Sequence, residues 1–289
     1  METRKTDGGG LLLVDKPAGV TSHDVVAVVR RAAGMSRVGH AGTLDPFATG
    51  LLVVLLGRGT RLIPYIDGDP KVYDAVIRFG SETDTDDVTG DTIREAAAPS
   101  ADAIAEGIAQ LSGEIDQMPP AYSAKKVDGV RAYAAARQGT PLALAASRVV
   151  VHSWTVISRS ENELATTITC NGGTYVRALA RDLGRLAGSA AHLASLRRTR
   201  SGAFSVEAAV SLDAVRAGEF SLRPFRDAVA EMPAQGLDEA ELGRVLHGNP
   251  VAARTIGARI ALVDDKEGLI AVAERAGDTL RPTLVLRDA

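Results

Sequence analysis

The chain has 289 residues, of which 45% are hydrophobic and 24% are charged, and its formal net charge is -3. These values are typical of a folded globular protein, and they exclude a disordered, collagenous or coiled-coil chain. The single cysteine, Cys170, excludes a disulfide framework and a cysteine-based zinc site.

The sequence gives no sign of a membrane segment. The longest purely apolar runs, 11–14 and 51–56, are far shorter than the ~20 residues that cross a bilayer. The start of the chain is polar and glycine-rich, so we expect no signal peptide. Together with the lone cysteine, these features predict a cytoplasmic protein without a membrane partner.

The first predicted elements alternate between strand and helix. A short buried strand at 11–15 ends in a Lys-Pro-Ala-Gly turn, after which Thr21 or Ser22 can cap a helix that runs to about Ala33. Two further strands follow, a buried apolar one at 50–57 and a half-buried, alternating one at 71–79.

The middle of the chain continues in the same mixed manner. Ser100 caps a helix whose apolar face carries Ile104, Ile108 and Leu111. Strands are then expected at 148–157 and 164–170, and a helix at 175–186 after a sharp Asn-Gly-Gly turn. Because strands and helices mix without a regular β-α-β rhythm, the predicted fold class is α+β, with a mixed, mainly antiparallel sheet flanked by helices.

A domain boundary is predicted near 231–236. It divides the chain into a larger domain, 1–231, and a small β-rich domain, 232–289. The smaller domain is expected to hold a helix at 237–246 and strands at 259–263, 269–273 and 283–286. Since its size is near the lower limit for independent stability, we expect it to pack on the larger domain.

No motif for a metal or a cofactor stands out. The five histidines have no metal-ligand spacing, and there is no G-x-x-x-x-G-K-[ST] phosphate loop. The glycines at 8–10 precede a strand instead of following one, which is not the dinucleotide-binding arrangement. We therefore expect neither a metal nor a cofactor.

The charge is unevenly distributed although its sum is small. A net charge of -3 is not the strongly basic value that often marks a nucleic-acid-binding protein. Arginines nevertheless gather between 177 and 200, while acids gather at 82–91. This asymmetry is compatible with an anionic ligand on one face, and also with an ordinary solvated helix face.

The most informative segment is 37–50, Arg-Val-Gly-His-Ala-Gly-Thr-Leu-Asp-Pro-Phe-Ala-Thr-Gly. Its glycines and proline predict a loop between a helix and a buried strand, in which the backbone can approach a ligand closely. His40 and Asp45 lie in this loop, and loops anchored on strands present reactive side chains. Asp before Pro is also typical of a simple turn, so the residues alone leave a catalytic and a structural interpretation open.

The segment with Gly-Thr-Leu-Asp-Pro resembles the catalytic motif of the TruB-type bacterial tRNA pseudouridine synthases. Other stretches resemble motifs of that family in the same order, at 13–22, 71–75, 79–90, 173–184 and 192–198. The resemblance covers residues from about 10 to 205, and several ordered motifs together are specific. It implies the pseudouridine synthase fold with a small C-terminal PUA-like domain.

The resemblance also implies a reaction and the residues that carry it. The family isomerises the T-loop uridine of tRNA, position 55, to pseudouridine without a cofactor. Asp45 aligns with the essential nucleophile, and a carboxylate is ionised at neutral pH and can attack a sugar carbon or stabilise positive charge there. Tyr73 aligns with the tyrosine that stacks on the target base and is a candidate for removing the final proton. Arg177 aligns with the arginine that pairs with the nucleophile.

Three further positions carry over as substrate-binding residues. Tyr175 and Leu196 correspond to walls of the pocket, and His40 to a histidine that fills the space left by the flipped base. Each of these residues also has an ordinary interpretation, as a core side chain or a loop histidine. Tyr73 would likewise suit a strand that packs in a sheet, and Arg177 a surface helix.

The expected partner is the T arm of tRNA, since a stacked uridine must be flipped out before its glycosidic bond can be reached. We expect a monomer that needs no obligate protein partner. The family implies that an insertion at 119–139 clamps the RNA and that the tail grips the acceptor arm. The residues predicted to form the RNA-binding patch are Lys125, Lys126, Arg131, Arg181, Arg197 and Arg198.

Two other functions fit part of the sequence. The first is an RNA-binding chaperone for tRNA folding on the same scaffold, and the presence of Asp45, Tyr73 and Arg177 together favours catalysis over it. The second is a carbohydrate hydrolase that uses Asp45, but such an enzyme would need a second carboxylate as acid, and the resemblance supplies none.

Overall fold

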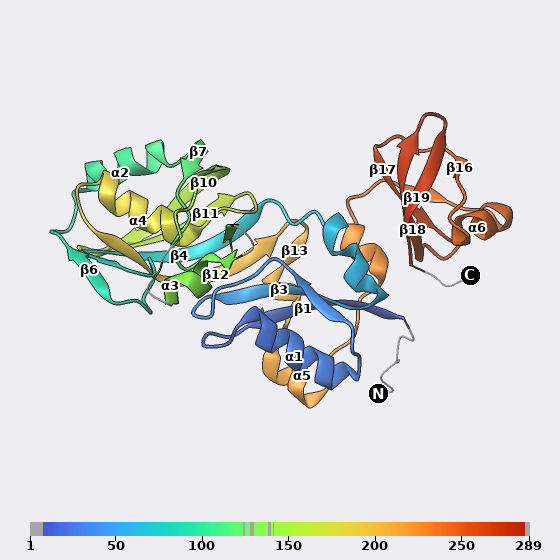
Figure 1. The fold of residues 1–289 in the computed structure, drawn as a ribbon, viewed down its shortest axis with the longest axis horizontal. Helices are drawn as coiled ribbons and strands as arrows, with labels where there is room; N and C mark the ends of the chain where they lie inside the picture. Colours follow the sequence, from blue (N-terminus) through green and yellow to red (C-terminus); the bar gives the residue numbers. More distant parts are fainter. Residues whose placement is uncertain (1–7, 124, 128–129, 138–139, 141, 287–289) are drawn as a thin grey trace. The chain divides into compact units, whose positions relative to one another are not determined.

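The computed structural model describes residues 8–123, 125–127, 130–137, 140 and 142–286 (Figure 1). The chain divides into two compact units. Counting only the described residues, the first unit comprises those between Met1 and Leu44, Leu51 and Gly68, and Ala203 and Ala289, and the second comprises those between Asp45 and Gly50 and between Asp69 and Gly202. The tail therefore belongs to the same compact unit as the N-terminal segments, whereas the boundary near 231 was predicted from the residues of the sequence alone. A functional division into 1–231 and 232–289 stays a prediction.

The first unit begins with a small sheet and its helices. Its sheet has the order β14-β1-β3, with β2 antiparallel to β3 and β14 parallel to β1. These elements are β1 (Gly9–Lys16), α1 (Ser22–Ala33), β2 (Val38–Ala41), β3 (Thr49–Gly57), η1 (Arg58–Tyr65), β13 (Phe204–Ser205), η2 (Val206–Ala208), β14 (Val210–Ser211), α5 (Leu212–Ala217) and η3 (Phe225–Val229).

Both faces of β1 and β3 are buried, which explains why each strand reads as a continuous apolar run. Leu12, Val14, Leu52 and Val54 pack against α1 and α5, which lie side by side (Figure 1). The alternate residues Leu11, Leu13, Leu51 and Val53 belong to a second cluster with Leu62 of η1 and with apolar residues of the C-terminal sheet.

Helix α1 begins where the sequence predicts. The Thr21 hydroxyl accepts a hydrogen bond from the backbone N–H of Asp24, and the Asp24 carboxylate accepts one from the backbone N–H of Thr21. This capping box satisfies donors that the first turn would otherwise leave unpaired. Gly34, in the left-handed conformation with φ +63°, ends the helix.

The C-terminal part of the first unit is a five-stranded sheet of order β15-β17-β18-β19-β16 with one helix. The elements are β15 (Ala234–Gly236), α6 (Glu239–Leu246), β16 (Val251–Ala252), β17 (Arg259–Val263), β18 (Leu269–Ala276) and β19 (Thr279–Val285). The helix and three strands were predicted. The sequence missed β15 and β16 because they have only three and two residues. The start of β19 was missed because it contains Pro282, which sits at an irregularity in the pairing with β18.

The second unit is built on an antiparallel sheet of order β12-β4-β11-β10-β7. The first residues of β3, Thr49 and Gly50, pair in parallel with Arg197 and Arg198 of β12 and make the sheet mixed. The strands are β4 (Lys71–Phe79), β5 (Ser81–Thr83), β6 (Thr92–Glu95), β7 (Gly113–Gln117), β8 (Lys126–Val127), β9 (Val130–Arg131), β10 (Ser147–Arg159), β11 (Glu163–Cys170) and β12 (Ala191–Ser201).

The helices of the second unit are α2 (Ala101–Gln110), α3 (Ala132–Arg137) and α4 (Val176–Leu186). Ser100 caps α2, as predicted, and the helix predicted at 175–186 is present one residue shorter, with Tyr175 as its N-cap residue. Helices α2 and α4 pack together, and α4 packs on β12 (Figure 1). The predicted α+β class with a mixed, mainly antiparallel sheet is confirmed. Within the described ranges, no helix has the length and apolar character needed to cross a membrane.

Candidate active site

Asp45 lies in a tight turn that is fixed on both sides. Just before it, the Ser22 hydroxyl accepts a hydrogen bond from the backbone N–H of Leu44 (2.9 Å) and donates one to its carbonyl oxygen (3.1 Å). Within the turn, the N–H of Ala48 donates to the carbonyl oxygen of Asp45 (3.2 Å). Gly50 has φ +100°, and a Cβ there would overlap the carbonyl oxygen of Arg198. Only glycine therefore lets the end of the turn dock on β12.

Arg177, in the first turn of α4, holds the carboxylate of Asp45 from one side. Its Nε donates to Oδ2 (2.9 Å) and its Nη2 to Oδ1 (3.1 Å), a bidentate pair. The Arg177 side chain is 5% exposed, whereas that of Asp45 is 35% exposed. The predicted contact is thus present, and it leaves part of the carboxylate open to a ligand.

The remaining N–H groups of Arg177 are directed at two other segments. Nη1 donates to the carbonyl oxygen of Thr85 (2.7 Å) and Nη2 to that of Tyr122 (2.9 Å). Nη1 also lies 3.5 Å from Oδ2 of Asp87, a buried carboxylate whose Oδ1 accepts hydrogen bonds from Thr85 and Thr89. The sequence analysis assigned no role to these partners. The alternation of Thr and Asp in 83–87 was the available signal, because such residues bind nearby backbone in turns.

Tyr73 is buried on β4, where it pairs with Arg198 of β12 on one side and with Ile168 of β11 on the other. Burial raises the pKa of the Tyr73 phenol, the Arg198 guanidinium opposes the rise, and the Asp45 charge adds to it. The phenol therefore stays protonated at neutral pH, and no phenolate is available there to accept a proton. Its ring remains suited to stacking.

Tyr175 is half-buried at the start of α4. The buried Gln117 side chain holds its backbone at both ends, since Tyr175 N–H donates to Oε1 (2.8 Å) and Nε2 donates to the Tyr175 carbonyl oxygen (3.0 Å). Burial raises the pKa of the Tyr175 phenol, and the charges of Arg177 and Asp45 act on it in opposite directions. Tyr175 thus lies beside the ion pair, and Gln117 is a supporting residue that the sequence analysis missed.

Leu196 and His40 occupy different units. Leu196 is buried on β12, and its carbonyl oxygen accepts a hydrogen bond from Thr49 Oγ1 at 3.5 Å, close to the Asp45 turn. His40 lies half-buried on β2, in the first unit. The roles predicted for both residues stay predictions.

The predicted RNA-binding patch needs a correction. Arg181 and Arg198 are only 6% and 1% exposed, so neither offers a surface guanidinium to a phosphate. Arg181 binds Asp86, Asp182 and the carbonyl oxygen of Met118, and Arg198 faces Tyr73. The charge pattern was misread because it does not distinguish buried ion pairs from a basic surface.

The structure describes the side chains of only two of the other four members of the patch, Arg197 and Lys125. Arg197 is half-buried, and the ammonium group of Lys125 donates to the Ser147 hydroxyl. Lys126 and Arg131 pair through their backbones in the β8–β9 hairpin, and their side chains lie outside the described part of the chain. The predicted insertion, 119–139, also includes positions outside the described residues. Its RNA-clamping role stays a prediction.

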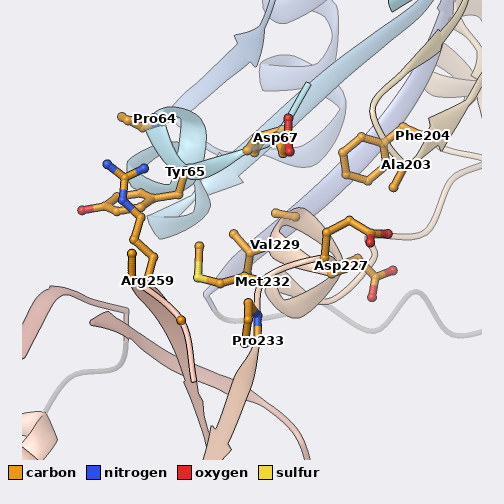
Figure 2. A pocket seen from close by; sticks show the side chains of 16 residues that line it. Pro64, Tyr65, Asp67, Ala203, Phe204, Asp227, Val229, Met232, Pro233 and Arg259 are labelled. Carbon is orange, nitrogen blue, oxygen red and sulfur yellow. The ribbon is translucent and has the colours of Figure 1, made fainter. Parts of the chain in front are cut away.

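A cavity of about 540 Å³ lies elsewhere, in the first unit (Figure 2). Tyr65, Val229, Met232 and Arg259 are among the residues that line it, and the Arg259 guanidinium lies 5.7 Å from the centre of the Tyr65 ring. None of the predicted site residues lines this cavity. The candidate site is instead the Asp45 turn with its neighbours in the second unit, where the predicted residues Asp45 and Arg177 are in contact.

Two family models match the sequence. One, described as "TruB family pseudouridylate synthase (N terminal domain)", matches residues 30–176, and one described as "tRNA pseudouridylate synthase B C-terminal domain" matches 177–246. The tRNA pseudouridine synthase B of Thermobifida fusca is 44% identical over 287 residues, covering 96% of this chain and 98% of that protein. The protein of that name from Leifsonia xyli is 52% identical over 214 residues, 71% of each chain.

Solved structures resemble the chain as well. The closely superimposing chains include one from a Cbf5-Nop10-Gar1 complex, with TM-score 0.73, 24% identity, and coverage of 96% of this chain and 85% of that one. Another is from an H/ACA RNP bound to a substrate RNA containing 2'-deoxyuridine, with TM-score 0.72, 22% identity and the same coverage. At these identities the likeness shows the fold.

Proposed function

The chain belongs to the TruB family of pseudouridylate synthases, an isomerase family that acts on tRNA, and we propose that it converts the T-loop uridine of tRNA, position 55, to pseudouridine. The observation that carries this proposal is the half-open Asp45 carboxylate held by two hydrogen bonds from buried Arg177. The arrangement fixes a nucleophile and leaves one side of it accessible.

In the proposed reaction, the bond between uracil N1 and the ribose breaks while Asp45 attacks the sugar carbon or stabilises positive charge on it. The uracil then turns, and its carbon 5 forms the new bond to the sugar carbon, while any bond between Asp45 and that carbon breaks and the carboxylate is released. The proton at carbon 5 is lost and N1 gains one, so nothing is added or removed. The Arg177 fork orients the carboxylate through these steps because two donors fix its plane.

The surrounding side chains receive the base. Tyr73 stacks on the uracil, and Tyr175 and Leu196 form walls of its pocket. His40 fills the space that the flipped nucleotide leaves. Since burial raises the pKa of the Tyr73 phenol, stacking suits Tyr73 better than removal of the final proton.

The RNA partner is the T arm of tRNA. We propose that Lys125, Lys126, Arg131 and Arg197 contact its phosphates, that 119–139 clamps it, and that the 232–289 tail is a PUA-like RNA-binding domain. The similar chain from the Cbf5-Nop10-Gar1 complex is bound there to other proteins. We propose that this chain instead acts in the cytoplasm as a monomer without an obligate protein partner.

The test is release of tritium from a T-arm stem-loop whose target uridine carries tritium at carbon 5. The unaltered protein is expected to release it, and Asp45→Asn is expected to bind the stem-loop without release. Asp213→Asn, at an exposed position on α5, is the matched control and should keep full activity. Release by Asp45→Asn would remove Asp45 from the mechanism. Binding without release by the unaltered protein would favour the tRNA-folding chaperone.

A further inference from the structure

Helix α4 carries a second buried arginine one turn after Arg177. Arg181 Nη1 donates to Oδ2 of Asp86 at 2.8 Å, with both side chains 8% exposed. Its Nη2 donates to the carbonyl oxygen of Met118 (2.8 Å), and its Nε to Oδ1 of Asp182 (2.8 Å). One guanidinium therefore joins α4 to two segments that are distant in sequence.

Those two segments are the ones that hold Arg177. The first is the β5–β6 loop, residues 84–91, which gives Thr85 O to Arg177 and the Asp86 carboxylate to Arg181. The second is the 117–122 segment, which gives Tyr122 O to Arg177 and Met118 O to Arg181. The two arginines thus grip the same pair of segments at successive turns of one helix.

The backbone of Asp86 ties the loop to the sheet as well. Its carbonyl oxygen accepts a hydrogen bond from Leu193 N–H on β12 (3.0 Å), and Val88 N–H donates to the Leu193 carbonyl oxygen (3.0 Å). Asp86 itself has φ +60°, a left-handed conformation that is unfavourable for a residue with a side chain. Burial of an ion pair and a strained backbone both cost stability, so stability alone is a poor explanation for this arrangement.

We propose that Arg181 and Asp86 form a positioning pair, which fixes the β5–β6 loop and the 117–122 segment so that their carbonyl groups align Arg177 on Asp45. The inference rests on the proposed function. Neither residue touches the substrate. They act through Arg177, because a displacement of about 1 Å in a reacting group can lower a rate about 100-fold.

The test compares Arg181→Gln and Asp86→Asn with a matched control, Glu82→Gln. The Glu82 carboxylate is buried on β5 of the same hairpin and is paired with Arg185, also on α4, and with Arg94 on β6, so these two ion-pair partners lie outside 84–91 and 117–122. In single-turnover tritium release, both test variants should be about 10- to 100-fold slower, while the control stays within about threefold of the unaltered protein. Affinity for the stem-loop should change less than about threefold in all three.

The two test substitutions should not be additive, since the pair acts as one unit. The double variant is expected to be no slower than the slower single variant. Arg181→Lys, which keeps the charge but not the three-way fork, should restore only part of the rate. Rates that fall no further than in Glu82→Gln would overturn the proposal.

Hydrogen exchange of the free protein tests positioning without the reaction. Arg181→Gln should raise amide exchange in 84–91 and 117–122 above the level in Glu82→Gln, with α2 unchanged. Equal exchange in the two variants would overturn the proposal. Failure of the unaltered protein to act on the stem-loop would contradict the proposed function instead, and the exchange comparison would still decide whether the pair positions these segments.

Discussion

The Gln117 side chain and the Tyr175 backbone form a reciprocal pair of hydrogen bonds at the start of α4, with Tyr175 N–H donating to Oε1 and Nε2 donating to the Tyr175 carbonyl oxygen. The Gln117 side chain thereby satisfies the N–H of the N-cap residue, one of the helix-terminal donors that have no partner within the helix. It also fixes the residue two positions before Arg177.

Replacement of Gln117 by alanine should therefore destabilise the protein. Loss of both bonds leaves the half-buried Tyr175 N–H without its acceptor, at a cost of roughly 1–3 kcal/mol, while the Tyr175 carbonyl oxygen still accepts from Leu179 N–H. Urea unfolding gives the free energy of unfolding for Gln117→Ala and for Gln110→Ala, an exposed control at the end of α2. Equal free energies for the two variants would contradict a supporting role of Gln117.

Arg177→Lys should preserve the charge beside Asp45 and still lose most of the activity. A lysine cannot form the bidentate pair, and it leaves the carbonyl groups of Thr85 and Tyr122 without their donors. We expect single-turnover tritium release to fall at least about 100-fold, with stem-loop affinity nearly unchanged.

The control for this change is Arg148→Lys, which alters an ion pair in which Nε and Nη2 both donate to Oε2 of Glu114 and which is exposed on both sides. Such a surface pair contributes little, so the control should keep its rate and its stability. A slow Arg148→Lys variant, or a fast Arg177→Lys variant, would show that the fork geometry at Asp45 does not govern the rate.

Substitutions of Tyr73 separate its ring from its hydroxyl group. If the ring stacks on the uracil, Tyr73→Phe should bind the stem-loop as the unaltered protein does, and Tyr73→Leu should lose ~1–3 kcal/mol of binding free energy. The raised pKa of the Tyr73 phenol predicts that the rate does not increase with phenolate formation between about pH 7 and 9. Tyr65→Phe, in the first unit, controls for the loss of a hydroxyl. A Phe variant that binds as weakly as the Leu variant would refute stacking.

Periodicity and caps predicted most of the fold because they are local. The alternation in 71–79 and the cap at Thr21 depend only on neighbours in sequence, and β4 and α1 lie where these signals put them. The sequence did not predict the very short strands β15 and β16, because they are defined by pairing with distant strands and not by a local pattern. The division into two compact units was not predicted either, because each unit is built from segments that are distant in sequence.

The candidate site shows the same limit. Asp45 and Arg177 were found through motifs, and their contact spans 132 residues of sequence. Arg181 and Arg198 were assigned to a surface because arginines usually lie there, and nothing local revealed that Asp86 and Tyr73 would cover them. Gln117 and the contact of Asp87 with Arg177 were missed because these partners become neighbours only after folding.

The Asp86 carboxylate should make stability and activity respond to pH in opposite directions. Burial raises its pKa from 3.8 to about 6, against the opposing charges of Arg181, Arg177 and Arg185 and with the help of Glu82. The folded protein then binds this proton more readily than the unfolded chain does. Its contribution to the free energy of unfolding is thus fully present below about pH 4 and is lost as the pH rises through 6.

Urea unfolding from pH 4 to 7.5 can test this sign. The free energy of unfolding of the unaltered protein should fall relative to that of Asp86→Asn by up to about 3 kcal/mol over that range. Relative to that of Glu82→Gln it should not fall, because Arg185 and Arg94 lower the pKa of the Glu82 carboxyl in spite of its burial. Single-turnover activity of the unaltered protein should instead rise through pH 6, because only the ionised Asp86 pairs fully with Arg181. Parallel stability profiles for the unaltered protein and Asp86→Asn would contradict the prediction. Opposite trends would mean that the pair is retained for alignment of Arg177, at the expense of stability.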